Sequence, residues 1–295
     1  MQYLDYFNQH PATSIAIVAA ISLLIGSFLN VVIYRLPLMM MRDWRQEIEE
    51  FDPDDLPKLP PQDQRFNLAV PDSTCPGCGH KIRAWENIPL ISYAVQRGRC
   101  SSCKTAISPR YPIVEFVTAM LSVFVIQHFG LTAAGLLALF FTWSLISLTL
   151  IDADHKLLPD SITLPLMWAG LIANYFLVFD GVSFSDSFWG AIVGYMSLWS
   201  IYWLFKLLTG KEGMGYGDFK LLAALGAWMG WQALPLIIIL SAGVGAVVGI
   251  TLMVVAKRDS QATLPFGPYL AAAGFIAMIW GDIITQTYLQ FAGMN

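Results

Sequence analysis

Long apolar stretches alternate with short polar segments along most of this chain. A helix needs roughly 20 apolar residues to cross the hydrocarbon core of a bilayer, and several stretches here reach or approach that length. The pattern therefore predicts an all-α polytopic membrane protein with about eight transmembrane helices. The expected helices cover residues 13–34, 112–129, 132–151, 162–179, 187–206, 219–231, 234–256 and 265–285.

Composition supports this fold class. Only 13% of the 295 residues are charged and the mean hydropathy is +0.57, whereas soluble domains average about 25% charged residues. The first apolar stretch differs from a secretory signal, because Met1–Pro11 contains no Lys or Arg. Its apolar run also exceeds the roughly 7–15 residues of a signal peptide. We expect it to be a retained transmembrane helix.

The positive charges predict the topology. All 17 Lys and Arg fall in four segments, and eleven of them lie between residues 35 and 110. The other segments hold Lys156, then Lys206, Lys211 and Lys220, and finally Lys257 and Arg258. Cytoplasmic loops carry the excess of Lys and Arg, so we expect all four segments in the cytosol. Eight helices then place both termini on the outer side.

The segment 35–110 is a small cytosolic insert between the first two expected helices, and it holds all four cysteines. They form two C-x-x-C pairs, Cys75 with Cys78 and Cys100 with Cys103. Stable disulfides are rare in a reducing compartment, so the spacing predicts a structural zinc site with four thiolate ligands. The alternatives are redox-active or accidental pairs, and a site in which His80 replaces one cysteine.

Two acids lie at the polar ends of apolar segments, where a charge costs free energy. Asp152 ends one expected helix and Asp218 begins another. The predicted topology puts both at the cytosolic boundary at similar depth, so they can face one cavity. Asp154 and His155 are alternatives to Asp152, but a shift of two residues turns Asp154 away from the face that Asp152 presents.

The residues around these acids suggest local roles. Asp160 is expected to cap the helix that follows Pro159. Gly213, Gly215 and Gly217 precede Asp218, and glycines allow unusual backbone conformations and close approach of another segment.

Paired carboxylates suit hydrolysis of a peptide bond. One carboxylate takes a proton from the attacking water, and the other donates a proton to the oxyanion or the leaving amine. The sequence offers no Ser/His/Asp constellation, H-E-x-x-H motif or phosphate loop as a competitor. We therefore expect an intramembrane aspartyl protease. The alternative is a polytopic transporter, although transporters place acids near the bilayer midplane. A structural assembly factor has no use for two such acids.

Specific motifs give the chain a resemblance over nearly its whole length. They are GSFLNVVIYRLP (26–37), the two C-x-x-C pairs, RYPIVEF (110–116), IDADHKLLPD (151–160) and GMGYGDFKLLAALGAW (213–228). With these motifs the chain resembles the bacterial type IV prepilin peptidases. The Gly-Tyr-Gly-Asp of residues 215–218 is similar to the motif of presenilin-like intramembrane aspartyl proteases.

The resemblance implies a bifunctional enzyme of the bacterial inner membrane, with periplasmic termini and an active site at the cytosolic face. Asp152 and Asp218 would cleave the basic leader of type IV prepilins and secretion pseudopilins after a glycine. The new N-terminal residue would then be methylated with S-adenosylmethionine. The expected partners are these substrates and membrane lipid, and no nucleic acid is expected.

The resemblance also assigns methyl transfer to the insert, with Gly98 as a candidate cofactor-binding residue. The insert has no glycine-rich dinucleotide loop, and the alternative is that Gly98 only forms a turn before Cys100. The expected domains are a first transmembrane helix (1–34), a cytosolic zinc-binding insert with the methyltransferase region (35–110) and a membrane-embedded protease domain (111–295).

Overall fold

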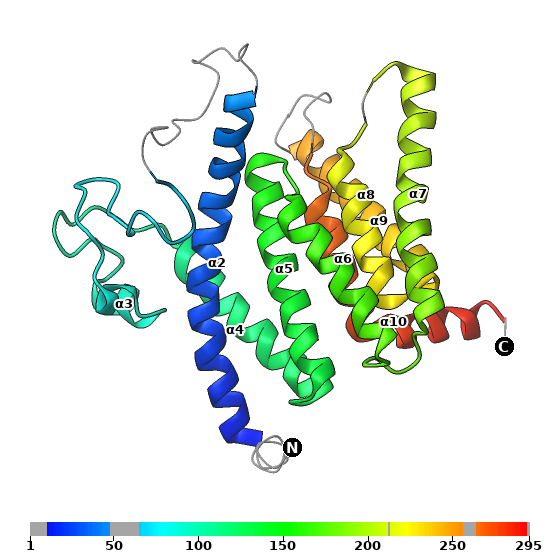
Figure 1. Cartoon of the computed structure of the whole chain (residues 1–295), viewed down its shortest axis with the longest axis horizontal. Coiled ribbons are helices and arrows are strands. Elements are labelled where there is room, and N and C mark those ends of the chain that lie inside the picture. Colours follow the sequence, from blue (N-terminus) through cyan, green and yellow to red (C-terminus); the bar gives the residue numbers. More distant parts are fainter. Residues whose placement is uncertain (1–10, 48–64, 212, 256–263, 294–295) are drawn as a thin grey trace. The chain divides into compact units, whose positions relative to one another are not determined.

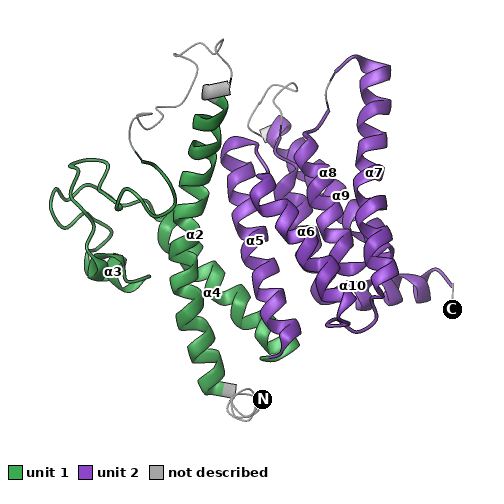
Figure 2. Cartoon of the chain, viewed as in Figure 1, with its two compact units in different colours: residues 1–131 green, residues 132–295 purple. Residues whose placement is uncertain are grey.

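The computed structural model describes residues 11–47, 65–211, 213–255 and 264–293. The chain forms two compact units, Met1–Leu131 and Thr132–Asn295 (Figure 2). The described residues contain helices and no strand (Figure 1). Six helices are long and apolar enough to cross a membrane, so the predicted class of all-α polytopic membrane protein is confirmed. The count of eight crossings stays a prediction.

The first unit is built on two helices that pack together, α2 (Pro11–Glu47) and α4 (Arg110–Phe129). Between them lie a short 3-10 helix, η1 (Ala84–Asn87), and a short α-helix, α3 (Ile91–Val95). The expected end of the first helix at residue 34 is wrong, because α2 continues through Pro37. A proline removes one backbone hydrogen bond, and the Leu and Met residues that follow it are strong helix formers.

The described residues of the second unit form six α-helices and one 3-10 turn. They are α5 (Ala133–His155), α6 (Asp160–Tyr175), α7 (Phe184–Thr209), α8 (Tyr216–Met229), η2 (Trp231–Ala233), α9 (Leu234–Val255) and α10 (Gly267–Phe291). Each of these α-helices corresponds to one expected from the apolar pattern. The predicted boundaries differ from the observed ones by a few residues, since polar residues extend several helices beyond their apolar segments.

Helix α8 packs against α6, α7 and α10, and nearly all of its residues are buried. Its 14 residues span only about 21 Å at 1.5 Å per residue, less than the roughly 30 Å of a hydrocarbon core. Glycines of the neighbouring helices permit the close packing, because an added Cβ at each would overlap atoms of α8. These glycines are Gly170, Gly190 and Gly274.

A short helix that ends inside a bundle leaves backbone carbonyls without helical partners. Side chains of α6 and α7 satisfy two of these carbonyls in α8. The amide nitrogen of Asn174 donates to the carbonyls of Ala227 and Trp228, at 2.9 and 3.1 Å. The Ser187 hydroxyl also donates to the Ala227 carbonyl. Backbone groups buried away from water need such partners, and these contacts allow α8 to end within the apolar part of the unit.

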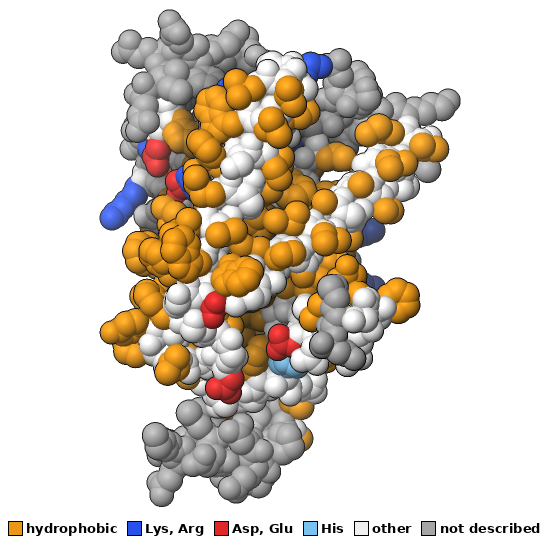
Figure 3. Space-filling view, turned by 90° about the vertical axis from the view of Figure 1, so that its right-hand side faces the viewer, with side chains coloured by type: hydrophobic (Ala, Val, Ile, Leu, Met, Phe, Trp, Pro, Cys, Tyr) orange, Lys and Arg blue, Asp and Glu red, His pale blue; other side chains and the backbone are white. Residues whose placement is uncertain are grey.

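Apolar side chains cover much of the outer surface, as the space-filling view shows for one face (Figure 3). Helices α7 and α9 contribute many of them. Exposed examples are Ile201, Leu204, Leu207, Leu208, Ile239, Val247, Ile250 and Val254. Such a surface is suited to contact with lipid.

Candidate functional site

The two predicted acids come from different helices of the second unit. Asp152 lies near the C-terminus of α5 and Asp218 in the first turn of α8, and both are buried. The Oδ2 of Asp152 accepts a hydrogen bond of 2.9 Å from the backbone N–H of Gly267, the first residue of α10. The carboxylate therefore lies at a helix N-terminus, where the helix dipole favours negative charge.

The structure brings the two acids together. Asp152 and Asp218 are close enough for their carboxylates to interact electrostatically. The side chain of Leu158 lies beside the backbone that precedes Asp218 and beside the start of α10. A Cβ added at Gly217 would lie 2.7 Å from this side chain, and one added at Gly267 would lie 3.1 Å from it. The two residues are 66 positions apart in the sequence (218 − 152), and the predicted topology places both at the same boundary.

One oxygen of this pair has an unusual environment. The Oδ1 of Asp218 is buried and has no hydrogen-bond partner among the described residues. Buried polar atoms in native proteins almost always have a partner, and an exception needs an explanation. A water molecule or a substrate group at this oxygen would supply one.

Sequence reasoning missed Gly267. An added Cβ at this position would lie 2.7 Å from Asp152 Oδ2, so only glycine lets the backbone N–H approach the carboxylate. A weak signal was present in the sequence, because Pro268 follows directly and proline favours the first turn of a helix. That signal predicts a helix start and not a partner in a distant acid.

The neighbouring acids have other positions. Asp154 is exposed on α5, as its place on the helix predicted. The expected cap at Asp160 is wrong, because Pro159 occupies the N-cap position of α6. Both carboxylate oxygens of Asp160 instead accept hydrogen bonds of 2.7 Å from Lys220 Nζ. This ion pair joins the N-terminal ends of α6 and α8, which the predicted topology places on the cytosolic side.

The glycines before Asp218 act through close packing more than through backbone freedom. Gly215 is the N-cap of α8 with a φ of −83°, a value open to any residue. Gly217 needs its small size, because an added Cβ would lie 2.7 Å from the Leu158 Cβ. The expectation of close approach is confirmed at Gly217, and unusual dihedrals are not found at Gly215.

The four cysteines of the first unit form one cluster. Their Sγ atoms all lie within 4.8 Å of one another, and those of Cys75 and Cys103 are 3.7 Å apart. A tetrahedral zinc ion with Zn–S bonds of about 2.3 Å requires sulfur atoms about 3.8 Å apart. The cluster therefore fits zinc, and it supplies the soft thiolate donors that zinc prefers.

The two halves of the cluster repeat the same backbone geometry. The N–H of Cys75 donates to the His80 carbonyl, and that of Cys100 donates to the Thr105 carbonyl. The residue after the second cysteine of each pair adopts left-handed dihedrals, Gly79 at φ +70° and Lys104 at φ +62°. Each turn therefore places the two sulfur atoms of its C-x-x-C pair within the cluster.

Side chains around the cluster hold the two turns together. The Nε2 of His80 lies 3.1 Å from Glu86 Oε2 and 3.3 Å from Ser101 Oγ, so His80 is a polar neighbour of the four cysteines. Hydrogen bonds from Ser101 and from the Arg83 backbone lower the pKa of Glu86 to about 2. The hydrogen bonds with Thr105 lower the pKa of Cys103 to about 6.

Gly98 lies in a turn between α3 and the second cysteine pair. Its φ is +66°, and an added Cβ would be 2.9 Å from the Tyr93 Oη. Its N–H donates to the Tyr93 carbonyl. The turn accounts for a glycine at this position, and a contact with the methyl donor stays a prediction.

The described helices and the buried carboxylate pair are those of a polytopic membrane protein with two acids at one site. Residues 139–250 match the family described as type IV leader peptidase, and residues 20–129 match the bacterial peptidase A24 N-terminal domain. The chain belongs to the type IV leader peptidase family.

Full-length relatives support this assignment. A prepilin leader peptidase/N-methyltransferase of Pseudomonas aeruginosa is 55% identical and covers 100% of both chains. Proteins of the same name from Stutzerimonas stutzeri and Aeromonas hydrophila are each 54% identical, with coverage of 99% and 97% of both chains. No solved structure matches the chain.

Proposed function

We propose that this protein cleaves the leader peptide of type IV prepilins and pseudopilins and then methylates the new N-terminus. The similarity to enzymes of this name runs the full length of the chain. The observation that carries the protease assignment is the meeting of Asp152 and Asp218 at one buried site, with the Asp218 Oδ1 unpartnered among the described residues.

The carboxylate pair is proposed to act by general acid–base catalysis. Two adjacent carboxyl groups do not readily both ionise, so the pair retains one proton. The ionised group accepts a proton from a water molecule while the oxygen of that water bonds to the peptide carbonyl carbon. The protonated group stabilises the oxyanion, and the carboxyl group that took the proton from water donates it to the leaving amine as the C–N bond breaks. Gly267 fixes Asp152 for this reaction through its N–H.

The substrate is expected to meet this pair at the cytosolic face of the bacterial inner membrane. The distribution of Lys and Arg supports cytosolic connections on the side where α5 ends and α8 begins, with periplasmic termini. In this orientation the basic leader stays in the cytosol and the apolar segment of the prepilin lies in the bilayer beside the apolar helices.

Methyl transfer is assigned to the first unit. The methyl donor, S-adenosylmethionine, supplies an electrophilic methyl group to the new terminal amine. Cys75, Cys78, Cys100 and Cys103 would hold a structural zinc ion, which stabilises a small insert that has little apolar core of its own. Gly98 is the residue proposed to contact the donor.

The protease assignment is tested with the full chain in detergent and a purified prepilin. We expect Asp152→Asn and Asp218→Asn to lower cleavage by about 10²–10⁴-fold, the usual contribution of a general acid or base. Asp154→Asn is the matched control, because Asp154 lies on the same helix end and is exposed. Full activity of either variant of the pair, or loss of activity in the control, contradicts the assignment.

The methyltransferase assignment has a separate test. Both Asn variants should still methylate a pilin that has already been cleaved. Gly98→Ala should lose methylation and keep cleavage. Gly79→Ala is the control and should keep both activities. It introduces comparable left-handed strain in the other turn, where nothing lies within 4 Å of an added Cβ. Equal methylation by the two Ala variants would show that Gly98 is only a turn residue.

A further inference from the structure

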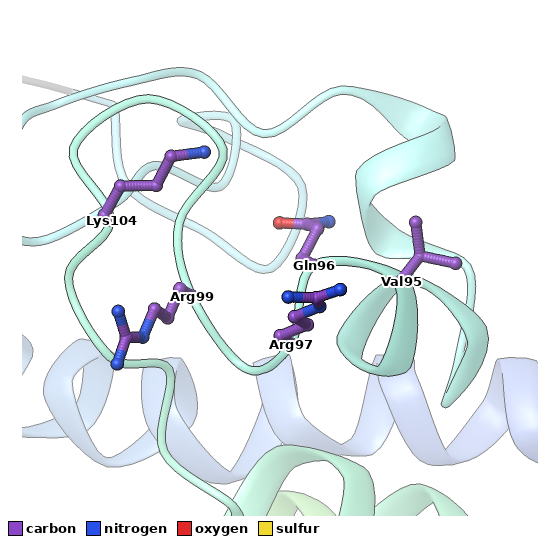
Figure 4. Close-up of a pocket in the computed structure, with 5 residues that line it drawn as sticks. All are labelled: Val95, Gln96, Arg97, Arg99 and Lys104. Atoms are coloured by element: carbon purple, nitrogen blue, oxygen red, sulfur yellow. The ribbon is translucent and has the colours of Figure 1, made fainter.

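A basic pocket lies beside the second cysteine turn, outside the carboxylate pair and the thiol cluster. Its volume is about 500 Å³, and it is lined by Val95, Gln96, Arg97, Arg99 and Lys104 (Figure 4). The lining includes three cations and no acid. The side chains of Arg97 and Arg99 form no hydrogen bond or ion pair with another described residue. Two free guanidinium groups in one hollow are suited to a phosphate or a carboxylate.

Two of these cations occupy backbone positions that favour glycine. Arg97 has a φ of +53° and Lys104 a φ of +62°. The position equivalent to Lys104 in the other cysteine turn is Gly79, which adopts the same conformation. Left-handed dihedrals are unfavourable for residues with a Cβ. Backbone strain of this kind costs free energy and occurs at functional sites.

Exposed apolar side chains continue from the pocket along α3 and η1. Val95, which lines the pocket, is 77% exposed, and Ile91 is 61% exposed. Trp85 and Ile88 extend the same segment, with 62% and 42% exposure. We call residues 85–95 the apolar lobe. Apolar residues with a tryptophan next to cations are typical of elements that lie in the membrane interface.

Within the first unit, a hydrogen bond anchors the apolar lobe to α4. The N–H of Leu90 donates to Glu115 Oε2 of α4 at 2.9 Å. Glu115 in turn packs against Gly26 of α2, where an added Cβ would lie 2.7 Å from its Cα. The apolar run of α2 continues over residues 27–33, about 10 Å further toward the cytosolic end. Figure 1 correspondingly shows α3 level with the middle of α2.

We propose that the apolar lobe lies in the headgroup and acyl boundary of the membrane and that the pocket binds the phosphate of an acidic phospholipid. The lobe supplies apolar contact, and Arg97, Arg99 and Lys104 supply charge complementarity. A methyl donor with a sulfonium is a poorer occupant of this pocket. Its positive charge would face three cations, and the lining offers only Val95 as an apolar contact for an adenine ring.

The test uses native mass spectrometry of the full chain in detergent with phosphatidylglycerol or phosphatidylcholine. Arg97→Gln with Arg99→Gln should weaken phosphatidylglycerol binding by about 30-fold, about fivefold for each cation lost, and leave phosphatidylcholine binding unchanged. The control, Arg65→Gln with Lys81→Gln, removes two exposed cations of the same insert that do not line the pocket. Equal phosphatidylglycerol binding by the wild type and the arginine double variant overturns the proposal.

Two further measurements separate the possible outcomes. Inorganic phosphate that displaces phosphatidylglycerol at equal concentration would show a site for soluble anions and not for lipid. Hydrogen exchange of residues 85–97 in nanodiscs should be slower with phosphatidylglycerol than with phosphatidylcholine alone, and the arginine double variant should lose this difference. Zinc content equal to that of the wild type shows that the double variant keeps its fold, so a negative result counts against the lipid site.

Discussion

At the residue scale, the contact between Asp152 and Gly267 defines how the carboxylate pair is held. A backbone N–H cannot change its rotamer, so it fixes the Asp152 carboxylate more rigidly than a long side chain would. The hydrogen bond also joins α5 to α10, which lie far apart in sequence and pack together in the second unit. Gly267 is therefore a positioning residue for the proposed reaction.

We expect Gly267→Ala to lower kcat for prepilin cleavage by about 10²-fold, the usual effect of displacing a catalytic group by about 1 Å. The added methyl group would lie 2.7 Å from Asp152 Oδ2 and force the carboxylate away from its position. Cleavage kinetics with purified enzyme measure the effect. Gly281→Ala on the same helix is the control, because its Cβ would meet only ordinary contacts at 3.9 Å. Equal activity of the two variants would refute the role of Gly267.

At the scale of elements, the position of Asp218 depends on α8. This helix is enclosed by α6, α7 and α10, and its backbone lies against glycines. A helix exposed to lipid must cover its own backbone and match the bilayer thickness. A helix enclosed by protein escapes both requirements, so α8 can be short and can begin where the proposed chemistry requires an acid.

We expect Gly190→Ala to destabilise the protein by about 1–3 kcal/mol, the typical cost of overpacking. An added Cβ at Gly190 would overlap the Gly226 carbonyl of α8, so α7 and α8 must separate. Thermal unfolding in detergent measures the change. Gly243→Ala on α9 is the control, because nothing lies within 4 Å of its Cβ position and alanine is the better helix former. A transition of Gly190→Ala at the wild-type temperature would contradict this account of α8.

At the scale of the whole molecule, the carboxylate pair and the thiol cluster belong to different compact units. The four cysteines have sequence numbers below 131, and both acids have numbers above 132. Each site is built from contacts inside its own unit. A substitution at one site should therefore leave the reaction proposed for the other site intact. A zinc ion that is not catalytic for peptide cleavage should be removable without loss of cleavage.

We expect the purified protein to contain about one zinc ion per chain, as four thiolates bind one tetrahedral ion. Cys75→Ser with Cys103→Ser should abolish zinc binding and methylation while prepilin cleavage persists, because the carboxylate pair lies in the other unit. Metal analysis and the two activity assays measure these outcomes. Ser101→Ala, beside a ligand, should keep its zinc. Wild-type protein without zinc or iron would disprove the metal site.

The apolar pattern was sufficient to predict the helical fold, because the length of hydrocarbon to be crossed sets the length of each apolar segment. It failed at residues 35–47, where α2 continues with polar residues beyond the apolar run. The cysteine spacing was sufficient to predict the thiol cluster, since two C-x-x-C turns carry their own local geometry. The division into domains and the roles of the acids remain predictions.

The sequence by itself determined the membrane class, the thiol cluster and the position of two acids at the ends of apolar segments. Each of these depends on local spacing or on the cost of charge near lipid. Only the tertiary structure decided that Gly267 holds Asp152, that Asp160 pairs with Lys220, and that α8 is enclosed by protein. These contacts join residues 60–115 positions apart. Periodicity cannot encode such distant pairs, because they arise from how the helices pack.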